Sequence, residues 1–286
     1  MDVKAGPGAE DYTCGRATYE GHKGTDFRLP TLADAHKGVA VLAAADGTVK
    51  GLRDGMADRL VKSPAQRESI KKRECGNGVL LDHGNGFETQ YCHMRKGSVR
   101  VKKGDKVARG EPLGLIGYSG AAGFAHVHIS VRKDGKTIDP FKGVAGAPAC
   151  GKGEKPLWRD DALANLNYDP TQVIGAGFAE GAVKLSALES GRQKSITPET
   201  SSNAIFAWGW AINLQKGDII VVVLKGPEGV IRKNDVTLDR DKAQYMLFAG
   251  TKKPQGGWPK GAYESQFKVT RSGKPVLNSS RRAVIQ

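Results

Sequence analysis

The first half of this 286-residue chain is dominated by short apolar runs that end at turn-forming dipeptides. Residues 39–45 lead into an Asp-Gly pair, and residues 79–81 are followed by an Asn-Gly pair. Both pairs supply the positive φ angles that tight β-turns require. Together with 38 glycines and an aromatic content of only 7%, this pattern predicts a mostly β fold. No apolar run approaches the about 18 residues of a membrane-spanning helix, so we expect no membrane span.

The second half of the chain has the pattern of a β-sandwich. Tyr263, Phe267 and Val269 alternate with polar residues, as in a half-buried antiparallel strand. Several further short apolar segments are separated by turn signals, which is typical of sandwiches. These segments lie at residues 205–210, 219–224, 236–238 and 244–248.

Composition divides the chain into four parts. Residues 151–156 are rich in glycine and lysine, as linkers are, and residues 157–166 can form a short helix. We therefore expect a flexible tail at residues 1–11, a β-rich domain at 12–150, a linker at 151–172 and a β-sandwich at 173–286.

The charge balance is strongly basic. Lys and Arg number 44 against 30 Asp and Glu, a net charge of +14 that is spread over both halves of the chain. An even excess of this kind favours a diffuse polyanion over one recognition helix. An anionic cell wall, a membrane surface and nucleic acid all meet that description, and charge alone does not choose among them.

The four cysteines are even in number, and none belongs to a Cys-x-x-Cys pair. Two disulfides formed in an oxidising compartment are therefore favoured over thiolate metal ligation, with four buried free thiols as the alternative. Cys75 and Cys92 flank the hairpin expected at residues 79–91, and Cys14 and Cys150 bracket the first domain, so we predict these two pairings. The first residues lack a signal peptide, so we expect a mature N-terminus preceded by an added Met.

Three patterns among the six histidines point to chemistry. His22 and Asp26 flank a glycine, His93 ends a strand, and His126 and His128 stand two residues apart. On a strand, residues i and i+2 share a face, so His126, His128 and Ser130 are expected opposite an aliphatic face. The same rule places His93 on the face of Tyr91 and turns Cys92 away.

Same-face imidazoles together with a His/Asp pair are the donors that a zinc site needs. Three protein ligands leave the fourth position to water, which is the catalytic arrangement. His36 and His83 lie in turn-like segments and are assigned surface or capping roles.

The motifs GHKGTDF (residues 21–27), YCHM (91–94) and AHVHI (125–129) resemble, in order and spacing, the lysostaphin/LytM-type zinc metallopeptidases that cut peptidoglycan peptides. The turn-rich segment at residues 101–114 and Asp139-Pro140 are also similar to that family. The resemblance covers residues 18–142. It implies the duplicated hybrid motif fold for the domain at residues 12–150.

Carried over position by position, the resemblance implies that His22, Asp26 and His128 bind Zn²⁺ and that His93 and His126 are catalytic. The implied function is a zinc-dependent endopeptidase that hydrolyses peptide cross-links of bacterial peptidoglycan through a metal-activated water. HVHIS in place of the usual HLHFE, and a long polar insertion at residues 50–74, depart from the family pattern. Neither removes a ligand or a catalytic histidine.

The resemblance also implies the surroundings of the enzyme. Its partners would be stem peptides or cross-bridges of peptidoglycan, with no specific nucleic acid, in a periplasmic or secreted monomer. The second half resembles an immunoglobulin-like sandwich, with residues 258–263 as its best marker. The main alternative is a non-catalytic peptidoglycan-binding or amidase-activating module on the same fold, which would lose zinc ligands. A biotinyl- or lipoyl-like carrier and a nucleic-acid-binding protein are further alternatives.

Overall fold

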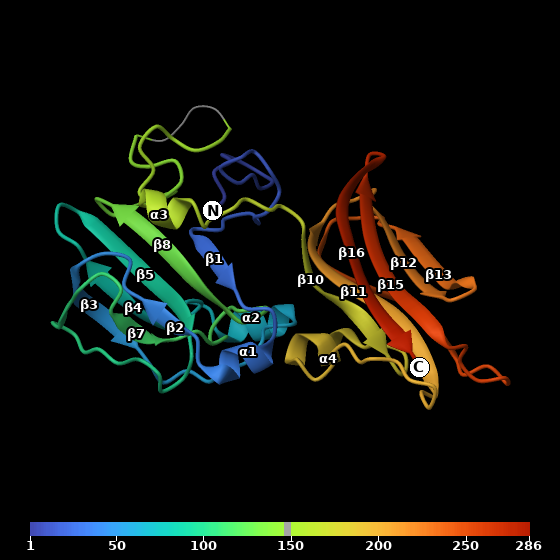
Figure 1. Ribbon diagram of the computed structural model, residues 1–286. Coiled ribbons are helices and arrows are strands. Elements are labelled where there is room, and N and C mark those ends of the chain that lie inside the picture. The colour runs from blue at the N-terminus through green and yellow to red at the C-terminus, as the bar shows by residue number, and fades with distance from the viewer. Residues whose placement is uncertain (146–149) are drawn as a thin grey trace. The chain divides into compact units, whose positions relative to one another are not determined.

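The computed structural model describes residues 1–145 and 150–286. The chain forms two compact units, Met1–Asn167 and Tyr168–Gln286. Both units are built mainly from β-strands, so the prediction of a mostly β protein is confirmed (Figure 1). In the described parts of the chain, the helices are too short or too polar to cross a membrane.

The first unit contains one large, largely antiparallel sheet and a two-stranded one. In the large sheet the neighbours run in the order β1 (Thr25–Arg28), β8 (His126–Lys133), β5 (Phe87–Met94), β4 (Asn77–Asp82), β3 (Gly47–Arg53) and β6 (Lys106–Val107), and β9 (Lys136–Ile138) pairs with β8. The smaller sheet consists of β2 (Ala40–Leu42) and β7 (Pro112–Leu115).

The core of this unit lies on one face of the large sheet. Val127, Ile129 and Val131 of β8 pack there with Tyr91 of β5 and Leu113 of β7. The aliphatic face predicted for β8 is therefore the core face. Because the strand period is two, His126, His128 and Ser130 point to the opposite side of the sheet.

Short helices decorate this unit. Helix α1 (Leu32–Lys37) begins at Thr31, whose side chain forms a capping box with Asp34, and ends at Gly38 with φ 90°. Helix α2 (Pro64–Ser69) lies in the polar insertion, and α3 (Asp160–Leu163) lies within the segment expected to form a short helix.

Both predicted disulfides are confirmed. Cys75 and Cys92 are bonded across the start of β4 and the end of β5, with a Cα–Cα distance of 4.8 Å. Cys14 and Cys150 are bonded with a Cα–Cα distance of 5.3 Å and close a loop of 136 residues. The second bond ties the beginning of the first unit to the segment after β9.

The second unit is a sandwich of two antiparallel sheets. One has the order β10 (Gln172–Ala179), β11 (Ala204–Leu214) and β14 (Lys242–Lys252); the other has the order β13 (Gly229–Thr237), β12 (Ile219–Gly226), β15 (Gly261–Arg271) and β16 (Lys274–Ile285). The core between them contains Ile220, Val222 and Leu224, which alternate along β12, and Phe267 of β15. Helix α4 (Leu185–Ser190) contributes Leu188 to a second cluster with Trp208 and Trp210.

Candidate metal centre

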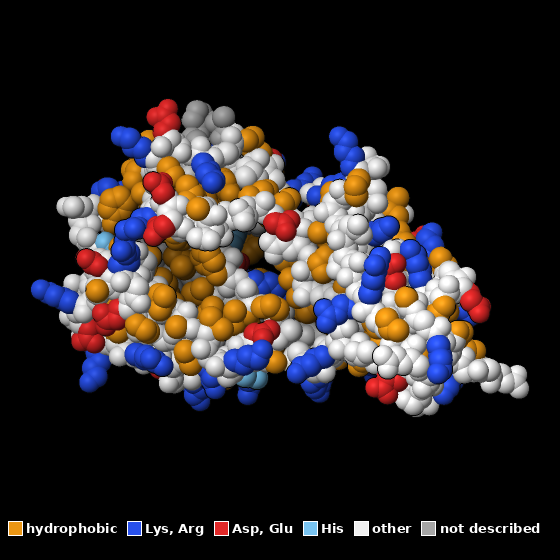
Figure 2. Space-filling view, in the orientation of Figure 1, with side chains coloured by type: hydrophobic (Ala, Val, Ile, Leu, Met, Phe, Trp, Pro, Cys, Tyr) orange, Lys and Arg blue, Asp and Glu red, His pale blue; other side chains and the backbone are white. Residues whose placement is uncertain are grey.

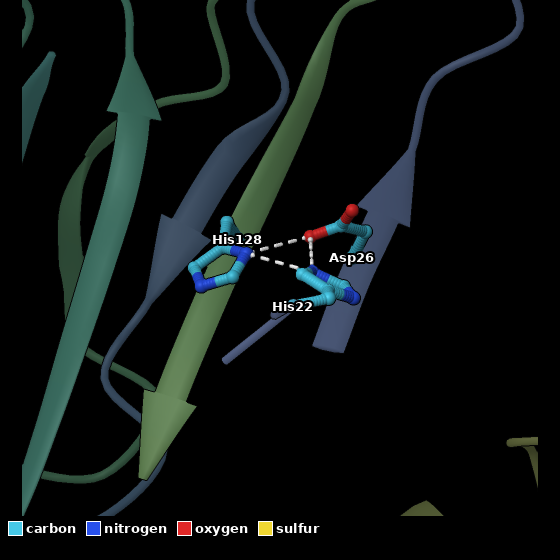
Figure 3. A group of neighbouring side chains, drawn as sticks. All are labelled: His22, Asp26 and His128. Carbon is cyan, nitrogen blue, oxygen red and sulfur yellow. Dashed lines mark hydrogen bonds and ion pairs between the residues drawn. The ribbon is translucent and has the colours of Figure 1, made fainter. Parts of the chain in front are cut away.

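Pairing of the edge strand β1 with β8 brings the two distant histidine motifs together. The register places Asp26 opposite His128 and Arg28 opposite His126. Opposed residues of an antiparallel pair project their side chains to the same face. His22 reaches this face from the loop before β1, so that His22, Asp26 and His128 converge (Figure 3).

The three converging side chains offer three donor atoms at short range. His22 Nε2 lies 3.1 Å from Asp26 Oδ1 and 3.1 Å from His128 Nδ1, and His128 Nδ1 lies 2.8 Å from Asp26 Oδ1. Donors bound about 2.0–2.2 Å from a tetrahedral zinc lie roughly 3.3–3.6 Å apart, so this set needs to open by only about half an ångström. Two imidazole nitrogens and a carboxylate are ordinary zinc donors, and the residues fit the metal.

Ser130 fixes the tautomer of His128. Its hydroxyl donates to the carbonyl of Lys23 at 2.7 Å and lies 3.0 Å from His128 Nε2. Since that hydroxyl hydrogen is already used, Ser130 accepts a hydrogen from Nε2, which leaves the Nδ1 lone pair free to bind the metal. On His22, Nδ1 lies 3.3 Å from the hydroxyl of Thr18, so Nε2 is the atom that faces the other ligands.

The charge state of Asp26 suits a metal ligand. Burial alone would raise the pKa of its carboxyl, but the neighbouring His128, His22 and His126 side chains hold the pKa well below the usual value. Tyr19 stacks on His22 with ring centroids 4.4 Å apart. Burial, with the Asp26 charge, raises the pKa of Tyr19 to about 12, so its phenol stays protonated.

His93 and His126 lie beside these three side chains, with the centroids of their own two rings 4.5 Å apart. His93 Nδ1 donates to the carbonyl of Ser119 at 2.8 Å, and His126 Nδ1 donates to the carbonyl of Phe124 at 3.0 Å. A carbonyl can only accept, so each Nδ1 carries the hydrogen and each Nε2 is bare when the ring is neutral. His126 Nε2 lies 3.7 Å from Asp26 Oδ1.

Burial keeps both of these imidazoles neutral. It lowers the pKa of His93 to about 3, with a further contribution from the neighbouring His126. Burial also lowers the pKa of His126, although the Asp26 carboxylate opposes that effect. At neutral pH the two rings are therefore neutral and present bare Nε2 atoms.

The backbone at His93 corrects one prediction. Strict alternation placed His93 on the face of Tyr91, but Tyr91 is in the core while His93 contacts His126 on the opposite face. His93 has φ 63°, a left-handed conformation that is uncommon outside glycine, and this residue breaks the strand alternation. Cys92 pairs with His128 across β5 and β8, so the Cys75–Cys92 disulfide lies next to His128.

The polar insertion packs along the segment that holds His93. Val61 donates its backbone N–H to the carbonyl of Ala122 at 2.9 Å, and Ala121 donates to the carbonyl of Glu74 at 2.7 Å. The insertion therefore contacts residues 121 and 122, close to Ser119, whose carbonyl accepts a hydrogen bond from His93. The sequence identified the insertion but contained no signal for this position.

The two remaining histidines lie outside the five-residue group. His36 Nε2 is 3.3 Å from the hydroxyl of Tyr118 on the surface. His83 uses both ring nitrogens, one on the carbonyl of Asp46 at 2.6 Å and one on the hydroxyl of Thr89 at 2.7 Å.

Part of the chain is similar in sequence to known peptidases. Residues 20–140 match the sequence model of Peptidase family M23. The chain is 31% identical over 121 residues to the peptidoglycan DD-endopeptidase ShyA of Vibrio cholerae, covering 42% of this chain and 22% of that protein. It is 28% identical over 164 residues to the DD-carboxypeptidase/endopeptidase Mpg of Neisseria meningitidis, covering 54% and 32%. The chain thus spans less than a third of the length of these two relatives.

Two solved structures are similar to between 42% and 48% of this chain. A zinc-containing peptidase from Vibrio cholerae is 24% identical, with a TM-score of 0.32 and coverage of 48% of this chain and 35% of that one. The catalytic domain of lysostaphin from Staphylococcus simulans is 22% identical, with a TM-score of 0.30 and coverage of 42% and 75%. The family match and the donor set support Zn²⁺ as the metal, and His22, Asp26 and His128 are the residues that could hold it.

Proposed function

Because residues 20–140 are a Peptidase family M23 domain, we propose that this protein is a zinc-dependent endopeptidase that hydrolyses peptide cross-links of bacterial peptidoglycan. The observation that carries the proposal is the joining of two groups at one site. Three side chains suited to zinc, His22, Asp26 and His128, lie beside two neutral imidazoles whose Nε2 atoms are bare.

Two further observations support the substrate class. The curated relatives named above are peptidoglycan DD-endopeptidases or DD-carboxypeptidase/endopeptidases. The net charge of +14 suits an anionic polymer such as a cell wall with free stem-peptide carboxylates. Stem peptides or cross-bridges are therefore the proposed partners.

The proposed chemistry divides between the metal and the protein. When bound, Zn²⁺ polarises a carbonyl and lowers the pKa of water. The sequence has no His-Glu-x-x-His motif to supply a glutamate base. His93 and His126 are the groups placed to take up a proton at Nε2 and, once protonated, to donate a hydrogen bond to developing negative charge.

Backbone carbonyls orient both proposed catalytic rings. Because the Nδ1 hydrogens of His93 and His126 are held by Ser119 and Phe124, the rings cannot swing their Nε2 atoms away without losing a buried hydrogen bond. Preorganisation of this kind is what a proton-transfer group requires.

The alternative is a non-catalytic peptidoglycan-binding or amidase-activating module. Such a module needs neither a complete ligand set nor the two additional histidines. All five residues are present and adjacent in this chain, which favours the enzyme.

We also propose a periplasmic or secreted monomer with an immunoglobulin-like second unit. Two disulfides support an oxidising compartment. The strand orders β10-β11-β14 and β13-β12-β15-β16 correspond to the A-B-E and C′-C-F-G orders of an immunoglobulin-type sandwich, which supports the second assignment.

Digestion of intact sacculi tests the proposed activity. The purified, zinc-loaded protein is incubated with sacculi, and the soluble fragments are identified by mass spectrometry, with a chelator-treated sample as the control. We expect fragments with new peptide termini from the zinc-loaded protein alone. Binding to sacculi without release of any fragment would instead support the non-catalytic module.

A further inference from the structure

A cavity of about 540 Å³ lies in the first unit, behind the sheet that carries the metal centre. Thr89, Ile129 and Val131 line it, and on β8 the last two alternate with His128 and Ser130 of the site. Figure 2 shows a hollow with hydrophobic side chains on this unit, below the position of α3. We propose that this cavity binds a small amphipathic anion, with an apolar body and one carboxylate-like head. The proposal does not rest on the proposed function.

The apolar side chains that line the cavity indicate that part of the ligand is apolar. Phe87 and the two β8 residues meet Leu157 and Trp158 from the segment that leads into α3. Leu157 and Phe87 are not fully buried, so apolar surface is left open to water that a ligand could cover. The volume lies within the range of about 300–1,000 Å³ that is usual for small-molecule sites.

The negative head of the ligand is indicated by the charged residues of the lining. Glu88 pairs with Lys50 at 2.5 Å, and Asp161 pairs with Arg159 at 3.0 Å. Arg109 is exposed, and within the described residues its guanidinium has no hydrogen-bonded partner. The lining itself holds two cations, Arg109 and Arg159, and two carboxylates, Glu88 and Asp161, and Lys50 pairs with Glu88 from outside it. Arg109 is thus the cation of the lining whose guanidinium is left for a ligand, and an anion is its complement.

A second unused donor lies in the same wall. The indole N–H of Trp158 is buried and has no hydrogen-bond partner in the described parts of the chain. A buried donor without an acceptor costs free energy, and an acceptor on a ligand that reached the indole N–H would recover it. A carboxylate can accept from both Arg109 and an indole, whereas an ammonium head could accept from neither.

The test uses dodecanoate as the probe, below its micelle concentration, with isothermal titration calorimetry on the full chain. Dodecanol and 2-naphthoate are the comparison probes, which separate the need for a charge from the need for a flexible chain. We expect one saturable site for dodecanoate, at least tenfold weaker binding of dodecanol, and a rise in Tm with dodecanoate because the ligand binds only the folded state. Tighter binding of 2-naphthoate would place an aromatic rather than an acyl body in the cavity.

Two variants separate the cavity from unspecific adsorption. Arg109→Gln is expected to weaken dodecanoate about tenfold and to leave dodecanol unchanged, and Ala162→Phe is expected to abolish binding of both by filling the cavity from α3. Lys103→Gln, an exposed cation outside the lining, is the matched control and should bind like the parent. Equal affinity for dodecanoate in Arg109→Gln and the parent, or non-saturable uptake in all proteins, would overturn the proposal.

Discussion

The hydroxyl of Ser130 lies 3.0 Å from Nε2 of His128 and donates its own hydrogen to the carbonyl of Lys23. This contact holds His128 in the tautomer whose Nδ1 faces His22 and Asp26. The orientation of a proposed metal ligand therefore depends on a residue two positions further along the same strand.

Ser130→Ala should weaken zinc binding by about 10- to 100-fold, because partners of this type tune the basicity and orientation of ligating histidines. Zinc affinity is measured by competition with a chromophoric chelator. Ser280→Ala, an exposed serine on β16 of the second unit, is the matched control and should bind zinc like the parent. An unchanged affinity in Ser130→Ala would show that the contact does not orient the ligand.

The buried His93 makes stability depend on pH. Its pKa is about 3 in the folded chain against an ordinary 6.5, so the unfolded chain binds a proton that the folded chain does not. Stability is therefore fully present above pH 6.5 and is lost as the pH falls towards 3. His126, whose pKa is also lowered by burial, acts in the same direction.

Urea unfolding of chelator-treated protein between pH 7 and pH 4 measures this effect, because the stabilisation that Asp26 provides is lost mainly below its ordinary pKa of 3.8. His93→Gln should reduce the loss of stability over that interval, whereas His36→Gln, on an exposed histidine, should not. Identical pH dependence in the parent and His93→Gln would contradict the assigned protonation state.

The two disulfides should differ in their effects on stability and on turnover. The chain-entropy relation gives about 3 kcal/mol for the loop closed by Cys75–Cys92 and about 5 kcal/mol for the one closed by Cys14–Cys150. The shorter bond also lies at the site, because the carbonyl of Cys75 accepts from the backbone N–H of His93 at 2.8 Å.

Replacing Cys75 and Cys92 together by serine should lower turnover as well as stability. Replacing Cys14 and Cys150 should lower stability more and turnover less, when both are measured below the unfolding transition. Urea titrations and fragment release give the two quantities, and full turnover in the Cys75/Cys92 double variant would contradict a role for that bond in holding His93.

The exposed Lys102, Lys103 and Lys106 provide a test of electrostatic attraction to the cell wall. Screening shortens the Debye length from about 10 Å at 0.1 M salt to about 3 Å at 1 M. Association with sacculi in a pelleting assay should weaken several-fold across that range, and replacing the three lysines by glutamine should have the same effect at low salt. Cleavage of a short neutral peptide is the control and should change little. Equal binding by the triple variant and the parent would leave these lysines with a role in solubility alone.

Local patterns predicted much of the site, and long-range pairing accounts for the rest. Alternation placed His126, His128 and Ser130 on one face because a strand has a period of two. The register that sets Asp26 opposite His128 joins residues about a hundred positions apart, and no local pattern encodes it. The left-handed backbone at His93 was not predicted, because the rule that alternate residues share a face assumes extended backbone at every residue.

The same limit applies beyond the histidines. The insertion at residues 50–74 was recognised as polar, but its contact with Ala121 and Ala122 forms only in the folded chain. The cavity behind β8 arises where the segment after Pro156 returns to the sheet, which apolar periodicity in either segment does not reveal.

The zinc content of site variants, together with their release of fragments from sacculi, tests most directly which residues bind the metal and which are catalytic. His22→Ala, Asp26→Ala and His128→Ala should each lose the metal, because three ligands with one removed rarely hold a catalytic zinc. His93→Ala and His126→Ala should keep about one zinc per chain and release no fragments. Full zinc in His128→Ala, or normal fragment release by zinc-loaded His126→Ala, would contradict the account.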